Sequence, residues 1–177
     1  MRANKQKGFT LIEMIVVIGI LGVLSALLFT IVNPIGQFRK ANDTRRKSDL
    51  AQLQRALEQY YQDHGQYPKY STVAPLYEVV DFSNVNMNPL PGIAWGNPWQ
   101  PYMNFLPKDP TNGRNYLYVT DATFQTYWIY TSLEQGAADP QTCNRGFVCN
   151  NVPTNAYCGS DASAICNYGV SSSNTSP

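Results

Sequence analysis

The stretch that decides the fold is Lys7-Gly8-Phe9-Thr10-Leu11-Ile12-Glu13, which opens an almost unbroken apolar run ending at Val32. As a helix, residues 9–32 would be roughly 36 Å long at about 1.5 Å per residue. That length is enough to cross a hydrocarbon layer of about 30 Å. We therefore predict a membrane-spanning helix over residues 9–32.

Glu13 is the acidic residue inside this apolar run. An ionised side chain near the centre of a bilayer costs about 2.5–3.5 kcal/mol. Residues 10–31 contain no Lys, Arg or His that could pair with the carboxylate. We therefore expect the partner of Glu13 to come from a chain terminus or from another molecule.

The segment from Lys7 to Glu13 resembles the class III signal of type IV prepilins and type II secretion pseudopilins. A short basic leader, Gly8, Phe9 and the glutamate stand in the same order before the apolar segment. The resemblance implies that prepilin peptidase removes the leader, residues 1–8, by cleaving between Gly8 and Phe9, and that the new amine of Phe9 is methylated. It also implies assembly into a helical filament, in which Glu13 meets the Phe9 amine of a neighbouring subunit.

A simple signal anchor or a secretory signal peptide is the plainer alternative. A signal peptide has an apolar core of about 7–15 residues and an Ala-x-Ala-like cleavage site. Here the run is longer, and Gly8 precedes it. Basic residues flank both ends of the run, so Lys and Arg counts alone do not set its orientation. Placing residues 66–177 outside the membrane rests on the resemblance and on the cysteines.

The region after the span reads as a second, amphipathic helix over residues 33–65. Pro34 removes a backbone donor, so a kink or local melting is expected there. Gly65 and the nearby Pro68 are typical of a helix end. Spacings of three and four predict a buried stripe, and the charged side chains Asp49, Arg55, Glu58 and Asp63 are expected off it. The stripe comprises Leu50, Leu53, Leu57, Tyr60 and Tyr61.

The basic residues between Arg39 and Lys47 allow three interpretations. They could bind anionic lipid headgroups or the phosphates of DNA. We favour a solvated helix face, in which these side chains pair with Asp43 and Asp49. The lone His64 lies near the predicted helix end and lacks the companions of a metal or catalytic site.

The predicted head, residues 66–177, contains two strands over residues 114–121 and 123–133 with a turn at Asp121-Ala122. In one phase of this hairpin, Leu117 and Val119 would face the helix together with Tyr127, Ile129 and Leu133. Residues 69–110 are rich in proline and predict mainly irregular structure. Trp95 and Trp99 in this region would either cap the core or form a contact patch. Residues 171–177 are expected to be a mobile polar tail.

The resemblance raises one metal site for consideration, because some pseudopilins bind calcium in the segment that Lys108-Asp109-Pro110 resembles. Calcium requires six to eight oxygen ligands, and only Asp109 is clearly placed. We therefore expect no metal site and no cofactor.

All the cysteines of the chain follow residue 140. Their intervals do not fit a zinc site, and a non-cytosolic compartment permits disulfides. We predict two disulfides with three possible connectivities. Type IV pilins often carry a disulfide-bounded C-terminal region, so the cysteines favour a pilin over a pseudopilin. They are Cys143, Cys149, Cys158 and Cys166.

The predicted fold class is α+β: a pilin fold with a long N-terminal helix, a small antiparallel sheet and an irregular, disulfide-stapled C-terminal region. The chain has a net charge of only +1 and no evident catalytic motif, so we expect a structural protein and not an enzyme. The first interpretation is a subunit of an extracellular type IV pilus for adhesion, motility or DNA uptake. The alternatives are a type II secretion pseudopilin that forms a periplasmic pseudopilus, or a minor tip pilin with a binding role.

These interpretations imply a common set of partners. They are further copies of the chain, prepilin peptidase, the proteins of the assembly platform and the cytoplasmic membrane before assembly. DNA or a surface ligand would be an additional partner of a pilus.

Overall fold

The chain folds as two compact units, residues 1–38 and residues 39–177. Most of the leader, residues 1–7, lies outside the described part of the chain. The computed structural model describes residues 8–70, 79–80, 93–160, 162–172 and 177.

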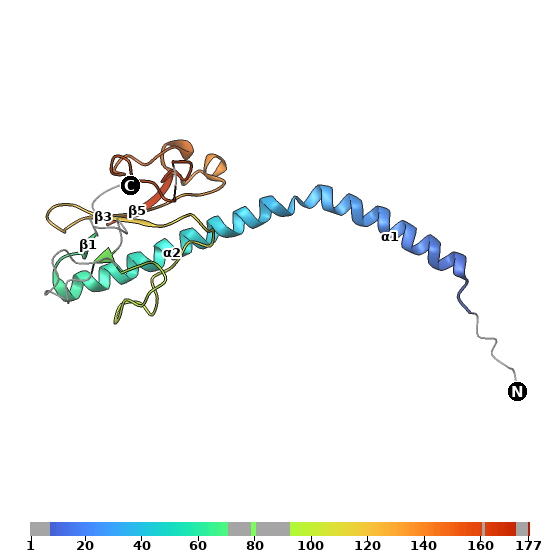
Figure 1. Cartoon of the computed structure of the whole chain (residues 1–177), viewed down its shortest axis with the longest axis horizontal. Helices are drawn as coiled ribbons and strands as arrows, with labels where there is room; N and C mark the ends of the chain where they lie inside the picture. Colours follow the sequence, from blue (N-terminus) through green and yellow to red (C-terminus); the bar gives the residue numbers. More distant parts are fainter. Residues whose placement is uncertain (1–7, 71–78, 81–92, 161, 173–176) are drawn as a thin grey trace, which may run out of the picture. The chain divides into compact units, whose positions relative to one another are not determined.

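The N-terminal unit is built on helix α1, which spans Leu11–Val32 (Figure 1). Its side chains are apolar around the whole circumference, as expected of a helix surrounded by lipid. The window Leu11–Leu28 has the length and composition to span a membrane. The predicted apolar helix over residues 9–32 is therefore present, beginning two residues later.

Helix α2 spans Pro34–His64 and carries the predicted stripe, since Leu50, Leu53, Leu57 and Tyr60 are all buried. Gly65 ends the helix with a φ of 70°, which favours glycine, and its N–H donates to the Tyr61 carbonyl at 2.7 Å. The predicted end of the helix is therefore confirmed.

The C-terminal unit contains a three-stranded antiparallel sheet with the order β3-β4-β5. In this sheet Val119 pairs with Trp128, and Ile129 pairs with Val170. A separate two-stranded sheet joins β1 and β2, and two short 3-10 helices, η1 and η2, follow β4. The bounds are β1 Lys69–Tyr70, β2 Val79–Val80, β3 Leu117–Thr120, β4 Tyr127–Thr131, η1 Gly136–Ala138, η2 Cys143–Gly146 and β5 Tyr168–Ser171.

Strand β5 was not predicted. Its last residue, Ser171, was assigned to the polar tail, but it pairs with Trp128 in the sheet. Residues 173–176 of that tail lie outside the described part of the chain. The two predicted strands are confirmed in shorter form as β3 and β4.

One face of the sheet packs against α2. This core brings Leu53 and Leu57 of α2 together with Tyr118, Tyr127 and Ile129 of the sheet. Trp99 is also buried in it and Trp95 packs against it, so these tryptophans cap the core and form no contact patch.

The opposite face of the sheet packs under the C-terminal segment that contains the cysteines. Leu117 and Val119 lie on this face, in a cluster with Tyr130 and Cys158. The predicted phase of β3 was therefore wrong, although Tyr127 and Ile129 face α2 as expected. Both faces of β3 are buried, so alternation along the strand does not tell one face from the other.

Candidate functional site

The N-terminal segment presents the predicted processing residues on an exposed, non-helical stretch. Gly8 and Phe9 precede α1, and Phe9 is 76 % exposed. A Cβ added at Gly8 would meet nothing within 4 Å. The Gly8–Phe9 bond is therefore outside α1 and accessible without unwinding that helix.

Glu13 closes a capping box at the start of α1 with Thr10. Its Oε2 accepts the Thr10 N–H at 2.9 Å and the Thr10 hydroxyl at 2.8 Å, and the Glu13 N–H donates to Oγ1 at 3.3 Å. These bonds satisfy donors that the helix leaves unpaired, but they supply no positive charge. Among the described residues Glu13 has no cationic partner, so the expectation of an external charge remains a prediction.

Asn33 separates α1 from α2. It ends α1 in a left-handed conformation, with φ 41° and ψ 68°. Its Oδ1 accepts the Gly36 N–H at 3.2 Å, so the same residue also caps the start of α2. A Cβ at Gly36 would lie 3.0 Å from the Asn33 amide nitrogen, which shows how closely the cap fits. Together with Pro34 as the first residue of α2, this explains why the helix breaks where a kink was predicted.

Arg46 forms the centre of a buried ion cluster in the C-terminal unit. Its side chain is fully buried and contacts three carboxylates from three parts of the chain. The cluster ties α2 to the loop after residue 108 and to the segment after β4. The partners are Asp43 at 2.8 Å, Asp109 at 2.8 Å and Glu134 at 3.1 Å.

The surrounding groups complete this cluster. Asp43 accepts the backbone N–H groups of Glu134 and Gln135 at 2.8 and 2.9 Å. Burial of Glu134 opposes its ionisation, but hydrogen bonds from Arg46 and Asn42 outweigh this and lower the Glu134 pKa. Glu134 is therefore held ionised beside the Arg46 guanidinium.

The prediction that Arg46 lies on a solvated basic face is therefore wrong, because Arg46 is buried. The prediction that Asp49 lies off the buried stripe of α2 is also wrong. Asp49 is buried and accepts the Tyr116 hydroxyl at 2.7 Å. Burial raises the Asp49 pKa despite that bond and the nearby Arg45. The expectation holds for Arg45, which is 63 % exposed.

The residues around Asp109 do not fit a calcium ion. Both carboxylate oxygens accept from Arg46, at 2.8 and 2.9 Å, and Oδ1 also accepts the Thr111 N–H. A guanidinium therefore lies where a cation would have to bind this carboxylate. His64 likewise has a structural setting, because it stacks on Tyr60 and its Nε2 lies 2.9 Å from the Tyr102 hydroxyl.

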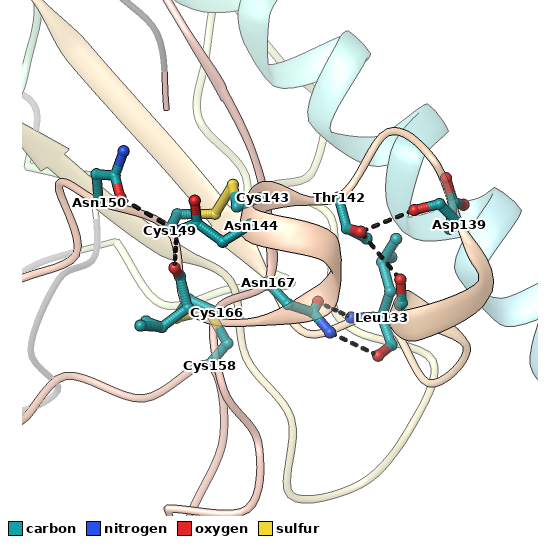
Figure 2. The surroundings of a disulfide bond; sticks show 12 residues. Leu133, Asp139, Thr142, Cys143, Asn144, Cys149, Asn150, Cys158, Cys166 and Asn167 are labelled. Atoms are coloured by element: carbon teal, nitrogen blue, oxygen red, sulfur yellow. Dashed lines mark hydrogen bonds between the residues drawn. A yellow bond between two sulfur atoms is a disulfide. The ribbon is translucent and has the colours of Figure 1, made fainter.

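The cysteines staple a C-terminal segment that we call the cap, residues 143–166. The disulfides join Cys143 to Cys149 and Cys158 to Cys166, which selects one of the three connectivities. Figure 2 shows the two rings side by side, linked by the bond from the Cys149 N–H to the Cys166 carbonyl.

Asn167 fixes the end of the cap to the segment that follows β4. Its side chain accepts the Leu133 N–H at 2.7 Å and donates to the Leu133 carbonyl at 3.1 Å (Figure 2). Its own carbonyl accepts the Cys143 N–H. The cap is therefore anchored at both rings to the segment that follows β4.

The smaller ring has an unusual backbone. Asn144, Arg145 and Gly146 are all left-handed, with φ of 46°, 59° and 93°. Only the last is a glycine, and such conformations cost non-glycine residues about 1–3 kcal/mol each. Gly146 packs against Ala137, since a Cβ there would lie 2.8 Å from the Ala137 Cα. This ring leaves Phe147 exposed.

Three residues of these sites, Thr10, Asp43 and Arg46, were missed from the sequence although a signal was present. Thr10 stands three residues before Glu13, which is the spacing of a capping box. Arg46 and Asp43 continue the stripe from Leu50 backwards at spacings of four and three, which places them on the buried face of α2. Asn33 carries only the weaker signal of preceding a proline.

Two family models match the chain. Residues 3–29 match the prokaryotic N-terminal methylation motif. Residues 33–145 match type II secretion system protein G.

Curated proteins of the same name are similar to the chain over most of their length. "Type II secretion system core protein G" of Escherichia coli (strain K12) is 36 % identical over 137 residues, covering 77 % of this chain and 88 % of that protein. The protein of that name from Pseudomonas aeruginosa (strain PAO1) is 36 % identical over 142 residues, covering 78 % and 93 %. The one from Vibrio cholerae serotype O1 is 32 % identical over 130 residues, covering 73 % and 82 %. No solved structure matches the chain.

Proposed function

Because the chain belongs to the type II secretion system protein G family, we propose that it is a pseudopilin whose filament serves protein export. The observation that carries this proposal is the family match over residues 33–145, which covers α2 and most of the C-terminal unit. Of the interpretations drawn from the sequence, this favours the secretion alternative over a type IV pilus.

The proposed sequence of events begins in the cytoplasmic membrane with α1 as the anchor. Prepilin peptidase removes the leader between Gly8 and Phe9, and the Phe9 amine is methylated; the methylation-motif match supports this step. The processed subunits then polymerise. The role is structural and not catalytic, and it involves no cofactor.

The location differs from the one expected first. We place the C-terminal unit and the assembled filament in the periplasm, and not on an extracellular pilus. The two disulfides are compatible with that compartment, because the bacterial periplasm is oxidising. Adhesion, motility and DNA uptake are not part of this proposal.

Glu13 supplies the chemistry of assembly in this proposal. Its carboxylate already accepts hydrogen bonds from Thr10. Thr10 directly follows Phe9, whose nitrogen cleavage would free as an amine. An amine from a neighbouring subunit would add the missing positive charge. Such a pair would form only between processed chains.

Deleting the gene in the native host tests this function. We expect exported proteins to accumulate in the periplasm, while filaments sheared from the cell surface remain unchanged. Complementation with the wild-type chain should restore export. Mass spectrometry of the filament protein should show a mature chain whose first residue is Phe9. Loss of sheared surface filaments with export intact would instead identify a type IV pilin.

A further inference from the structure

We propose that the cap is a contact between subunits: its exposed ring inserts into a cleft along α2 of a second copy of this chain. This inference rests on the proposed function, because it assigns a contact within the filament. It starts from the position of the cap, most of which lies beyond the part of the chain that matches protein G.

The first half of the contact is a feature that we call the knob, formed by Arg145, Phe147 and Val148. Phe147 is 70 % exposed and Val148 is 48 % exposed. Both lie in the ring closed by the Cys143–Cys149 disulfide. An arginine beside an exposed aromatic ring is the composition typical of residues that dominate binding energy.

The backbone holds the knob in one conformation before any partner binds. The left-handed residues at 144–146 turn the chain sharply, and the disulfide and the close packing of Gly146 on Ala137 hold that turn. Pre-organisation of this kind lowers the entropy cost of association. A strained, stapled turn that exposes a phenylalanine is costly in an isolated molecule, and burying that side chain in a partner would recover apolar free energy.

The second half is an open cleft of about 660 Å³ between α2 and the edge of the sheet at β5. Ala51 and Gln54 of α2 and Tyr127 of β4 are among its lining residues, and Glu58 lies on its wall. The Glu58 carboxylate accepts hydrogen bonds from the hydroxyls of Tyr67 and Tyr127. These bonds fix the negative charge in position.

The charges of the two features are complementary. In the described part of the chain, neither Arg145 nor Glu58 takes part in an ion pair. Arg55 also lines the cleft, but the described side chains of Arg55 and Glu58 form no ion pair with each other. Arg145 would therefore pair with Glu58, while Phe147 would lie on the exposed Ala51 and on the aliphatic part of Gln54.

The knob and the cleft belong to different faces of the C-terminal unit. The cap packs on the face of the sheet opposite α2, and the cleft runs along α2. A contact between two different patches is heterologous, and repeating it generates an open helical polymer when the rotation does not close. The occupant we assign to the cleft is therefore the same chain.

Photo-crosslinking in assembled filaments tests this contact directly. A benzophenone amino acid in place of Phe147 should form dimers, and mass spectrometry should locate the other end of the crosslink within residues 51–62. Crosslinks that map elsewhere on the chain, or to a different protein such as an exported one, would overturn the proposal.

Charge reversal gives a second test. Arg145→Glu and Glu58→Arg should each lower filament yield by roughly ten-fold, the size expected for a central contact, and the double variant should recover most of it. Lys108→Glu is the control for charge, because Lys108 is exposed and outside both features. Single variants that assemble like the wild type would contradict the contact.

The two proposals fail in different ways. Wild-type protein that forms no filaments at all overturns both. Wild-type filaments that form normally, with Phe147 crosslinks outside the cleft, overturn the contact alone and leave the role in export standing.

Discussion

Arg46 binds Asp109 through two parallel hydrogen bonds, from Nε to Oδ2 at 2.8 Å and from Nη2 to Oδ1 at 2.9 Å. This bidentate geometry is the strongest that an arginine and a carboxylate can form. It joins α2 to a loop that lies 63 residues further along the chain. The C-terminal unit therefore depends on one buried guanidinium for the position of that loop.

Replacing Arg46 should strongly destabilise the C-terminal unit. Arg46→Ala leaves the buried carboxylates of Asp43 and Asp109 without their cation, and breaking a buried pair typically costs about 3–5 kcal/mol. Arg45→Ala is the matched control, and we expect about 0–1 kcal/mol from its pair with Asp49, because the Arg45 side chain is exposed. Urea unfolding of the full chain in detergent, followed by circular dichroism, measures both. Equal midpoints for the two variants would contradict the role of the cluster.

Removing divalent cations should leave the stability unchanged. Arg46 occupies the position from which a calcium ion would bind Asp109, so no ion is needed to hold that loop. The midpoint of thermal unfolding should be the same with EDTA and with excess calcium. A lower midpoint in EDTA that calcium restores would show that this reasoning is wrong.

Acidic pH should weaken the fold through Glu134. Its pKa is lowered in the folded chain, so its contribution is fully present above its unfolded value of about 4.3 and is lost as the pH falls through the folded value. We expect the free energy of unfolding to decrease below about pH 5. The Glu134→Gln variant should have a lower free energy of unfolding at pH 7 than the wild type. Its free energy of unfolding should also fall less steeply as the pH is lowered. If the free energy of unfolding fell with pH equally steeply in the wild type and in Glu134→Gln, Glu134 would be excluded as a cause of the acid sensitivity.

Each disulfide should stabilise the cap separately. We expect each double replacement by serine to lower the free energy of unfolding by about 2–3 kcal/mol. One variant replaces Cys143 and Cys149, and the other replaces Cys158 and Cys166. Double replacement avoids leaving an odd thiol. Peptide mapping of the unreduced protein should find each pair within its own ring. A peptide that joins Cys143 to Cys158 or Cys166 would contradict the connectivity.

Glu13 should be required for assembly and not for folding of the C-terminal unit. Glu13→Leu should accumulate as processed monomer with both disulfides formed, because the pair with a neighbouring Phe9 amine is lost. Thr10→Val removes the hydroxyl that binds the carboxylate and should lower filament yield, whereas Thr10→Ser keeps it. Normal filament numbers from Glu13→Leu subunits alone would refute the charge pair.

Local patterns in the sequence were enough to predict the helices and their ends. The stripe through Leu50, Leu53 and Leu57 identified the buried face of α2, and Gly65 identified its end. These features depend on side-chain spacing within one element, and the resemblance to pilins added the order of the elements. The prediction of an α+β pilin fold followed from both.

Features that depend on two distant segments could not be predicted in the same way. Strand β5 contains Gly169 and serine, which have weak strand propensity, and it exists because β4 provides a partner. A Cβ at Gly169 would lie 2.6 Å from the Tyr130 ring, so the glycine is needed for a close approach that the sequence does not reveal. The disulfide connectivity likewise depended on the folded positions of the rings.

The break at Asn33 has a mechanical consequence for a polymer of such subunits. A continuous α-helix carries tension through an unbroken set of hydrogen bonds from residue i to i−4. That set is interrupted at Asn33, which is left-handed, and at Pro34, which has no N–H, and the backbone bond from the Gln37 N–H to the Asn33 carbonyl is long, at 3.3 Å. When the filament is pulled, extension should therefore begin at this point and leave the helical turns on either side intact. Each subunit would contribute a short elastic segment next to its anchor.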